Sequence, residues 1–170
     1  MNLSRRPVSI SVICGLDEIP AEISDLVWVE HLTLANDWPG RGPENRFTDL
    51  APLAHLTGLQ TLLFAGTQVT DLAPLTHVIG LQWLNFSFSP VTELAPLARL
   101  TALQTLDFTK TPVAHLAPLA QLNGLRTIGF SKTQVTNLAP LMDVIRKGNP
   151  VKWGSDSWWE GAGIYVRIVR

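Results

Sequence analysis

The feature that most constrains the fold is a tetrapeptide that recurs at a fixed interval. Leu-Ala-Pro-Leu occupies residues 50–53, 72–75, 94–97, 116–119 and 138–141, so the interval is 22 residues each time. The apolar residues between these copies repeat in the same phase. One such unit cannot bury its own apolar side, whereas stacked units bury a continuous core. The sequence therefore predicts a solenoid of stacked repeats.

Each unit changes its hydrophobic period along its length. Around residues 62–64 the apolar side chains alternate, which is the period of a strand. From residue 72 to 75 the spacing is three, which is typical of helical turns. Asp49 and Asp71 stand just before these turns, where a carboxylate can accept free backbone N–H groups. The proline falls in the first turn, where a missing N–H costs little. Each unit is therefore predicted to be a short strand, a turn and a short helical or 3-10 return.

The motif Leu59-x-x-Leu62-x-Phe64-x-x-Thr67-x-Val69 resembles the leucine-rich repeat family. The 22-residue length and the Asp-Leu-x-Pro-Leu return are similar to the internalin-like bacterial class, over about residues 26–153. The resemblance implies a right-handed solenoid with a parallel sheet of about six strands on its concave side. The last segment, Gly-Ile-Tyr-Val, also resembles segments that follow the repeats of bacterial Roco-type GTPase proteins.

One row of residues departs from the family pattern. The family usually has Asn at the turn after the strand, and this chain has Thr67, Ser89, Thr111 and Thr133 instead. Because a hydroxyl can bond nearby backbone groups, we expect the turn to persist with fewer hydrogen bonds per repeat.

The ends of the chain are irregular, as the ends of a solenoid must be. We expect a single leucine-rich repeat domain that comprises an N-terminal cap (1–27), an irregular first repeat with an insertion (28–49), regular repeats (50–141) and a C-terminal cap (142–170). The insertion contains Trp38. Two further strands are expected in the C-terminal cap, around residues 151–153 and 164–168.

Composition excludes several classes of protein. The chain has 170 residues, 46% of them hydrophobic, and a net charge of −1. This apolar fraction excludes disorder, no apolar run approaches the about 18 residues of a membrane helix, and the charge argues against nucleic-acid binding. Cys14 is the single cysteine, and the four histidines complete no metal-ligand pattern. We expect no catalytic residue, no metal and no cofactor, and a monomeric, non-enzymatic protein. The expected location is cytoplasmic, and secretion without a recognisable signal peptide is the alternative.

The predicted register indicates where a partner would bind. Side chains between the inward positions face the concave side, and most of them are small. Trp83 and Leu63 are the exceptions, and exposed aromatic residues often anchor interfaces. The alternative to a partner-binding role is that Trp83 packs sideways across neighbouring strands and that the inserted loop folds over it. The predicted partner-binding residues are Trp83, Leu63, Asn85, Asp107, Phe88 and Trp38.

These features favour a protein-protein interaction module that binds a protein or peptide on its concave face. The alternative is a recognition or regulatory arm of a larger protein, such as a Roco-type GTPase or a secreted effector.

Overall fold

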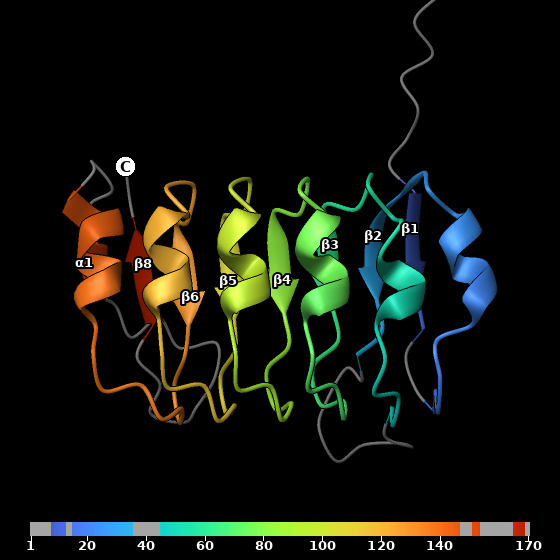
Figure 1. The fold of residues 1–170 in the computed structure, drawn as a ribbon, viewed down its shortest axis with the longest axis horizontal. Coiled ribbons are helices and arrows are strands. Elements are labelled where there is room, and N and C mark those ends of the chain that lie inside the picture. The colour runs from blue at the N-terminus through green and yellow to red at the C-terminus, as the bar shows by residue number, and fades with distance from the viewer. Residues whose placement is uncertain (1–7, 13–14, 36–44, 147–150, 154–164, 169–170) are drawn as a thin grey trace, which may run out of the picture.

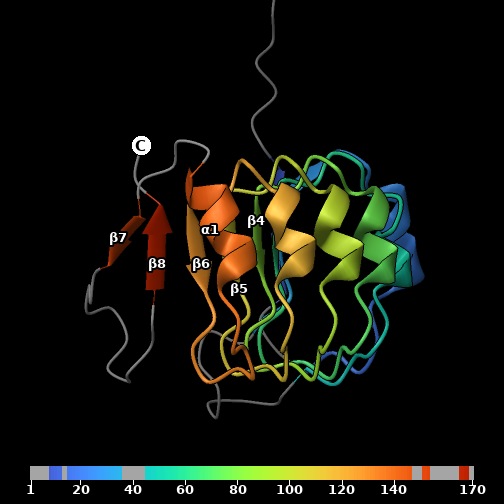
Figure 2. The same ribbon diagram turned by 60° about the vertical axis from the view of Figure 1, so that its left-hand side comes forward.

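The computed structural model describes residues 8–12, 15–35, 45–146, 151–153 and 165–168. Eight strands form one open sheet in the order β1-β2-β3-β4-β5-β6-β8-β7. The strands are β1 (Val8–Ser11), β2 (Val29–Thr33), β3 (Thr61–Leu63), β4 (Trp83–Asn85), β5 (Thr105–Asp107), β6 (Thr127–Gly129), β7 (Val151–Trp153) and β8 (Tyr165–Ile168). The helices stack in a second layer against the sheet (Figures 1 and 2).

The first six strands are all parallel, as the constant repeat length predicts. Every strand from β3 to β6 is aligned with its predecessor without a register shift, so that Leu62 pairs with Leu84 and Leu106 with Ile128. Equal repeats return each strand to the same height beside the one before it. The predicted six-stranded parallel sheet is therefore confirmed.

The returns are short 3-10 helices until the last repeat. They are η1 (Ala21–Asp25), η2 (Ala51–Leu53), η3 (Ala73–His77), η4 (Ala95–Arg99) and η5 (Ala117–Gln121), followed by the α-helix α1 (Ala139–Arg146). Asp49 Oδ1 accepts a hydrogen bond from the Ala51 N–H at 2.7 Å, and Asp71 Oδ1 accepts one from Ala73 at 2.8 Å. The predicted role of both aspartates at the start of a return is thus confirmed.

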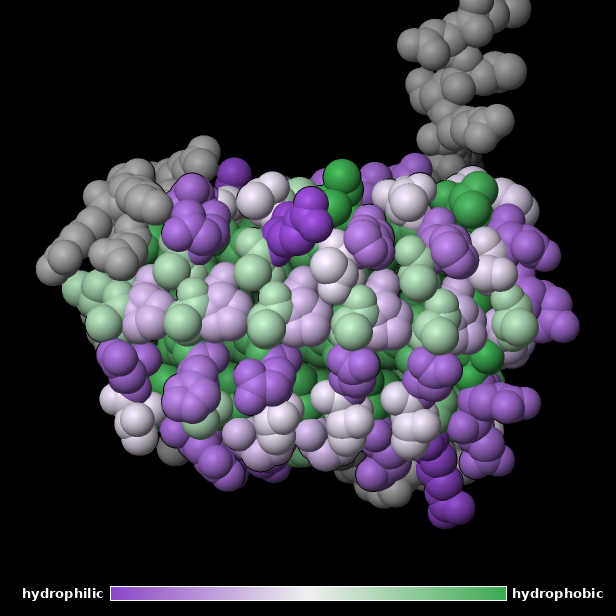
Figure 3. Space-filling view, in the orientation of Figure 1, coloured by the Kyte–Doolittle hydropathy of each residue, from purple (hydrophilic) through white to green (hydrophobic). Residues whose placement is uncertain are grey.

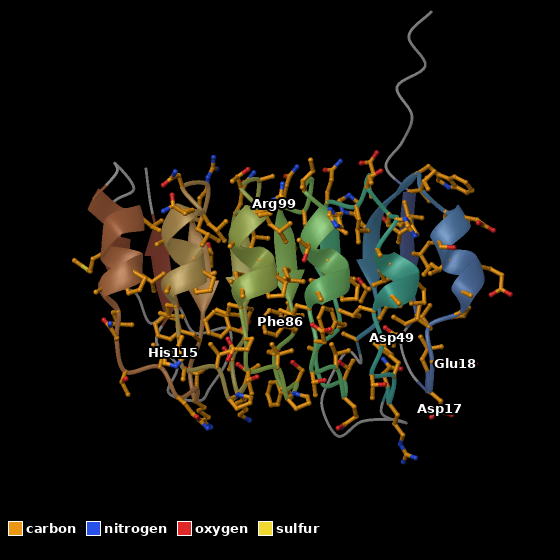
Figure 4. The ribbon with its side chains drawn as sticks, in the orientation of Figure 1. Asp17, Glu18, Asp49, Phe86, Arg99 and His115 are labelled. Atoms are coloured by element: carbon orange, nitrogen blue, oxygen red, sulfur yellow. The ribbon has the colours of Figure 1, made fainter. Side chains whose placement is uncertain are left out.

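The space between the two layers is filled by leucine, valine and phenylalanine side chains. Phe64, Phe86, Phe108 and Phe130 form a continuous stack, with ring centroids 5.9, 6.1 and 6.0 Å apart. Phe86, which is labelled in Figure 4, is fully buried in this core. Each ring is covered by the equivalent ring of the next repeat, so one repeat completes the core of its neighbour.

The hydroxyl row stabilises the turn after the strand, as predicted. Ser89 Oγ donates to the Phe86 carbonyl at 2.6 Å, Thr111 Oγ1 to Phe108 at 2.7 Å and Thr133 Oγ1 to Phe130 at 2.9 Å. Thr67 Oγ1 is buried with no hydrogen-bond partner among the described residues.

The C-terminal strands pair in a way that the sequence did not predict. β8 runs antiparallel to β6 and lies directly beside it, whereas β7 pairs with the far side of β8. The two expected strands therefore exist, but their spatial order is the reverse of their order in the chain. Ile164 lies outside the described residues, and the proposed division into caps and regular repeats remains a prediction.

Candidate functional site

The helices cover one side of the sheet and leave the other side uncovered (Figure 2). The alternation along the short strands decides which side chains face that uncovered side. The middle residue of each strand from β3 to β6 points into the core and is fully buried. The flanking residues face the other way, and together with two residues of β2 they form what we call the sheet face. Its positions are His31, Thr33, Thr61, Leu63, Trp83, Asn85, Thr105, Asp107, Thr127 and Gly129.

Trp83 is the largest side chain of the sheet face. It lies between Thr61 on β3 and Thr105 on β5, and 47% of its surface remains exposed. Leu63 lies diagonally from it on β3 and is half-buried. Among the described residues, sideways packing therefore covers only about half of the indole. The result is an aromatic side chain with small polar neighbours on an open sheet.

Asn85 and Asp107 perform the same structural task in successive repeats. Asn85 Oδ1 accepts a hydrogen bond from the Ser87 N–H at 2.9 Å. Asp107 Oδ1 accepts the equivalent bond from the Thr109 N–H, also at 2.9 Å. Both side chains thus fix the chain where it leaves the strand, and an amide oxygen does so as well as a carboxylate oxygen.

The carboxylate of Asp107 leans over the neighbouring glycine. A Cβ atom added to Gly129 would lie 2.8 Å from Asp107 Oδ1 and 2.9 Å from its Cγ, so any larger residue would displace the carboxylate. Burial raises the pKa of Asp107 above its ordinary value, and the hydrogen bond from the Thr109 backbone partly offsets this effect. Sequence reasoning selected Asp107 but missed this contact, which depends on the register of Gly129.

Phe88 lies at the edge of the sheet face, three residues after Asn85. It has a φ of 59°, and the equivalent residues Lys110 and Lys132 have φ values of 56° and 55°. Lys110 Nζ is 4.2 Å from the centroid of the Phe88 ring, and Phe88 remains 38% exposed. Gly66 in the same row signals this left-handed turn, and the sequence analysis did not use that signal.

The structure brings four predicted residues together and places a fifth beside them. Trp83, Leu63, Asn85 and Asp107 share the sheet face, and Phe88 follows at the edge where the strands end. Trp38 lies outside the described residues. The sequence analysis did not consider Trp28 and Ile79, which are exposed on the segments that lead into β2 and β4.

The rest of the described surface offers weaker candidates. A cavity of about 290 Å³ lies between the N-terminal segment and η2, and Asp17, Glu18, Phe47 and Asp49 are among its lining residues. Figure 4 shows its three acidic residues along one edge of the solenoid, away from Arg99. None of the predicted partner-binding residues that the structure describes lines this cavity. On the helix side, rows of hydrophilic side chains interrupt the hydrophobic surface (Figure 3).

Two kinds of feature are absent from the part of the chain that the structure describes. The described residues contain no group of three or more His, Cys, Asp or Glu side chains that could hold a metal ion. Among their helices, none has the length and apolar character needed to cross a membrane.

Comparison with known proteins shows the fold. No protein-family model and no curated protein matches the sequence. Among solved structures, an internalin (inlF) from Listeria monocytogenes matches 81% of this chain and 38% of its own, with 23% identity and a TM-score of 0.73. Internalin C2 from the same organism matches 75% of this chain and 53% of its own, with 29% identity and a TM-score of 0.66.

More distant repeat proteins also match. A leucine-rich repeat protein from Leptospira interrogans covers 82% of this chain and 34% of its own, with 20% identity and a TM-score of 0.63. The ectodomain of the Arabidopsis receptor kinase HAESA, solved with a peptide hormone, covers 76% and 22% respectively, with 24% identity and a TM-score of 0.61. The chain thus spans about half or less of each of these four structures. With the 22-residue repeat and the parallel sheet, these matches show an internalin-like leucine-rich repeat fold.

Proposed function

We propose that this chain is a non-enzymatic interaction module that binds a protein or peptide on its sheet face. The observation that carries the proposal is Trp83, a half-exposed indole on the uncovered side of the sheet. A folding role would bury more of this side chain. Aromatic anchors surrounded by polar groups are the residues that most often dominate the energy of an interface.

Two further observations support the proposal. The described sheet face contains short side chains around Trp83, and these lose little conformational entropy when a partner covers them. The HAESA ectodomain, which shares the fold, was solved in complex with a peptide hormone ligand. Extended peptides fit a flat sheet of this kind, and the same residues would serve a protein loop.

The test is to select peptides from a displayed library with the full chain and to measure their Kd by calorimetry. We expect Trp83→Ala to weaken the selected peptide at least about tenfold, since truncation of an anchor commonly costs about 2 kcal/mol. Ile79→Ala is the matched control, because Ile79 is exposed but lies outside the sheet face. It should leave the Kd unchanged, and both variants should melt within a few degrees of the parent.

Normal binding by Trp83→Ala would place the site elsewhere, and the returns around His55, His77 and Arg99 would be examined next. A loss of many degrees in the melting temperature would instead make Trp83 a packing residue.

We also propose a monomeric and cytoplasmic protein that needs no metal or cofactor and binds neither nucleic acid nor membranes. The second candidate function is that of a recognition or regulatory arm of a larger protein, of the Roco type or a secreted effector. Its support is that the matched structures are longer than the part which this chain covers. The genomic sequence on either side of the segment that encodes residues 1–170 tests this candidate directly.

A further inference from the structure

Asp107 carries a charge that its structural role does not require. In the preceding repeat Asn85 occupies the same position and accepts the same turn hydrogen bond at the same 2.9 Å. A neutral amide therefore suffices to hold the chain there. No other position of the sheet face, among the described residues, has an acidic side chain.

The charge is also held in an unfavourable place. Asp107 is largely withdrawn from water, and no ion pair with it is found among the described residues. The positions next to it on β4 and β6 are Asn85 and Gly129, and neither has a charge that could compensate the carboxylate. A withdrawn carboxylate without a cation destabilises a folded protein. The fold thus tolerates a cost that Asn at this position would avoid.

The surroundings leave the carboxylate accessible from one direction. Because Gly129 has no side chain, the Asp107 carboxylate lies across the space above it. Asp107 remains partly exposed, so a partner can reach its side chain from the sheet face. Trp83 stands one strand away and two residues earlier, which corresponds to about 8 Å between backbones. An indole and an anion at this separation match a cationic side chain next to an apolar one.

We propose that Asp107 binds the positively charged side chain, arginine or lysine, of a peptide whose neighbouring apolar side chain covers Trp83. This inference rests on the proposed function, because it names the chemistry of the partner at the same site. The carboxylate itself fills the space above Gly129, so the guanidinium or ammonium group lies against it from the open side of the sheet face. The partner supplies the positive charge that no described residue of the fold places beside the Asp107 carboxylate. Hydrogen bonds between charged groups of this kind are among the stronger ones.

The probe is N-acetyl-arginine methylamide, and its neutral counterpart is the citrulline analogue, which keeps the shape without the charge. We expect the arginine probe to shift the amide NMR signals of Asp107, Thr109 and Gly129 with a Kd in the millimolar range. The citrulline analogue should bind at least about fivefold more weakly.

Two variants test whether the carboxylate is responsible. Asp107→Asn should abolish the difference between the two probes, while the turn persists because Asn85 already holds the equivalent turn. Asp71→Asn is the matched control, since Asp71 is exposed and also accepts a backbone N–H, from Ala73. It should leave the binding of the arginine probe unchanged. Equal binding of both probes to the parent, or unchanged arginine binding to Asp107→Asn, would overturn the proposal.

The result can be separated from the outcome for the proposed function. A selected peptide that depends on Trp83 but binds Asp107→Asn normally would support the module and overturn the cation site. Arginine binding that depends on Asp107, without any peptide that depends on Trp83, would support the cation site and contradict the module.

Discussion

At the scale of single residues, Asp107 shows how a proposed binding position can oppose stability. Its folded pKa is raised because burial disfavours the charged form. Between its ordinary value of 3.8 and the raised value, the folded protein holds more protons than the unfolded chain. Stability therefore falls as the pH rises through this window, and it stays lower above the window. The described residues facing Asp107 from β4 and β6 are uncharged and do not alter this sign.

We predict that Asp107→Asn raises the melting temperature at pH 7 and has little effect near pH 3. At pH 7 the substitution removes a buried charge, whereas near pH 3 the carboxyl group is protonated in both the folded and the unfolded state. Calorimetric melting of parent and variant across this pH range checks the prediction. Asp71→Asn, at an exposed position, should show no such trend. A variant that is less stable than the parent at pH 7 would mean that the carboxylate stabilises the fold.

The sequence predicted which residues belong to the sheet face but not how their side chains are arranged. The alternation of Thr61, Leu62 and Leu63 fixes the sides of the strand, and the 22-residue interval transfers that assignment to Trp83 and Asp107. The contact of Asp107 with Gly129 was not predictable in this way. It depends on the side-chain angle of Asp107 and on the twist between β5 and β6, which no periodicity encodes.

At the scale of elements, the turn after each strand has a left-handed residue. Gly66 adopts it freely with a φ of 73°, whereas Phe88, Lys110 and Lys132 adopt it at φ values between 55° and 59° with a side chain present. A left-handed conformation costs a residue with a Cβ atom about 1–2 kcal/mol. Three neighbouring turns thus contain strain that glycine would relieve.

We predict that Lys132→Gly stabilises the protein by about 0.5–1 kcal/mol. Because 1 kcal/mol corresponds to about 2–4 °C for a chain of this size, the melting temperature should rise by up to about 4 °C. Lys110→Gly should gain less, because it also removes the cation–π contact with Phe88, which is worth about 0.5–1 kcal/mol at an exposed site. Arg126→Gly is the control, since Arg126 is exposed and has no positive φ. It should destabilise the protein. Equal changes at positions 110, 126 and 132 would show that the left-handed turns are not strained.

The returns were easier to predict than the turns. Leu-Ala-Pro-Leu combines a spacing of three with a proline in the first turn, and all five copies begin or contain a helical return. The sequence left open whether the returns are 3-10 or α-helical. The two kinds of return differ in whether another repeat follows them. The 3-10 helices η3, η4 and η5, which precede a further repeat, are five residues long. The α-helix α1, which no further repeat follows, is eight residues long.

At the scale of the whole molecule, the repeat predicts the middle of the solenoid better than its ends. Each regular strand has a neighbour of the same length and phase, so its register is determined. β7 and β8 have no equivalent repeat to copy. Sequence reasoning found both as strands but could not place β8 antiparallel between β6 and β7, because that pairing depends on a chain reversal without a periodic signal.

The pairing of β8 predicts a capping role that truncation can test. β8 is hydrogen-bonded to β6 through residues 127–129 and to β7 on its other side. Removal of residues 154–170 deletes β8, which leaves the edge of β6 unpaired and β7 without its neighbour. An unpaired strand edge beside an exposed core promotes aggregation.

We predict that the truncated chain melts at least about 5 °C below the parent, since 1 kcal/mol corresponds to about 2–4 °C for a chain of this size. It should also elute partly as aggregates in size-exclusion chromatography with light scattering. Removal of residues 169–170 alone is the matched control, because it leaves all of β8 in place. If the longer truncation stays monodisperse and melts with the parent, β6 tolerates an open edge and the C-terminal strands have a role other than capping.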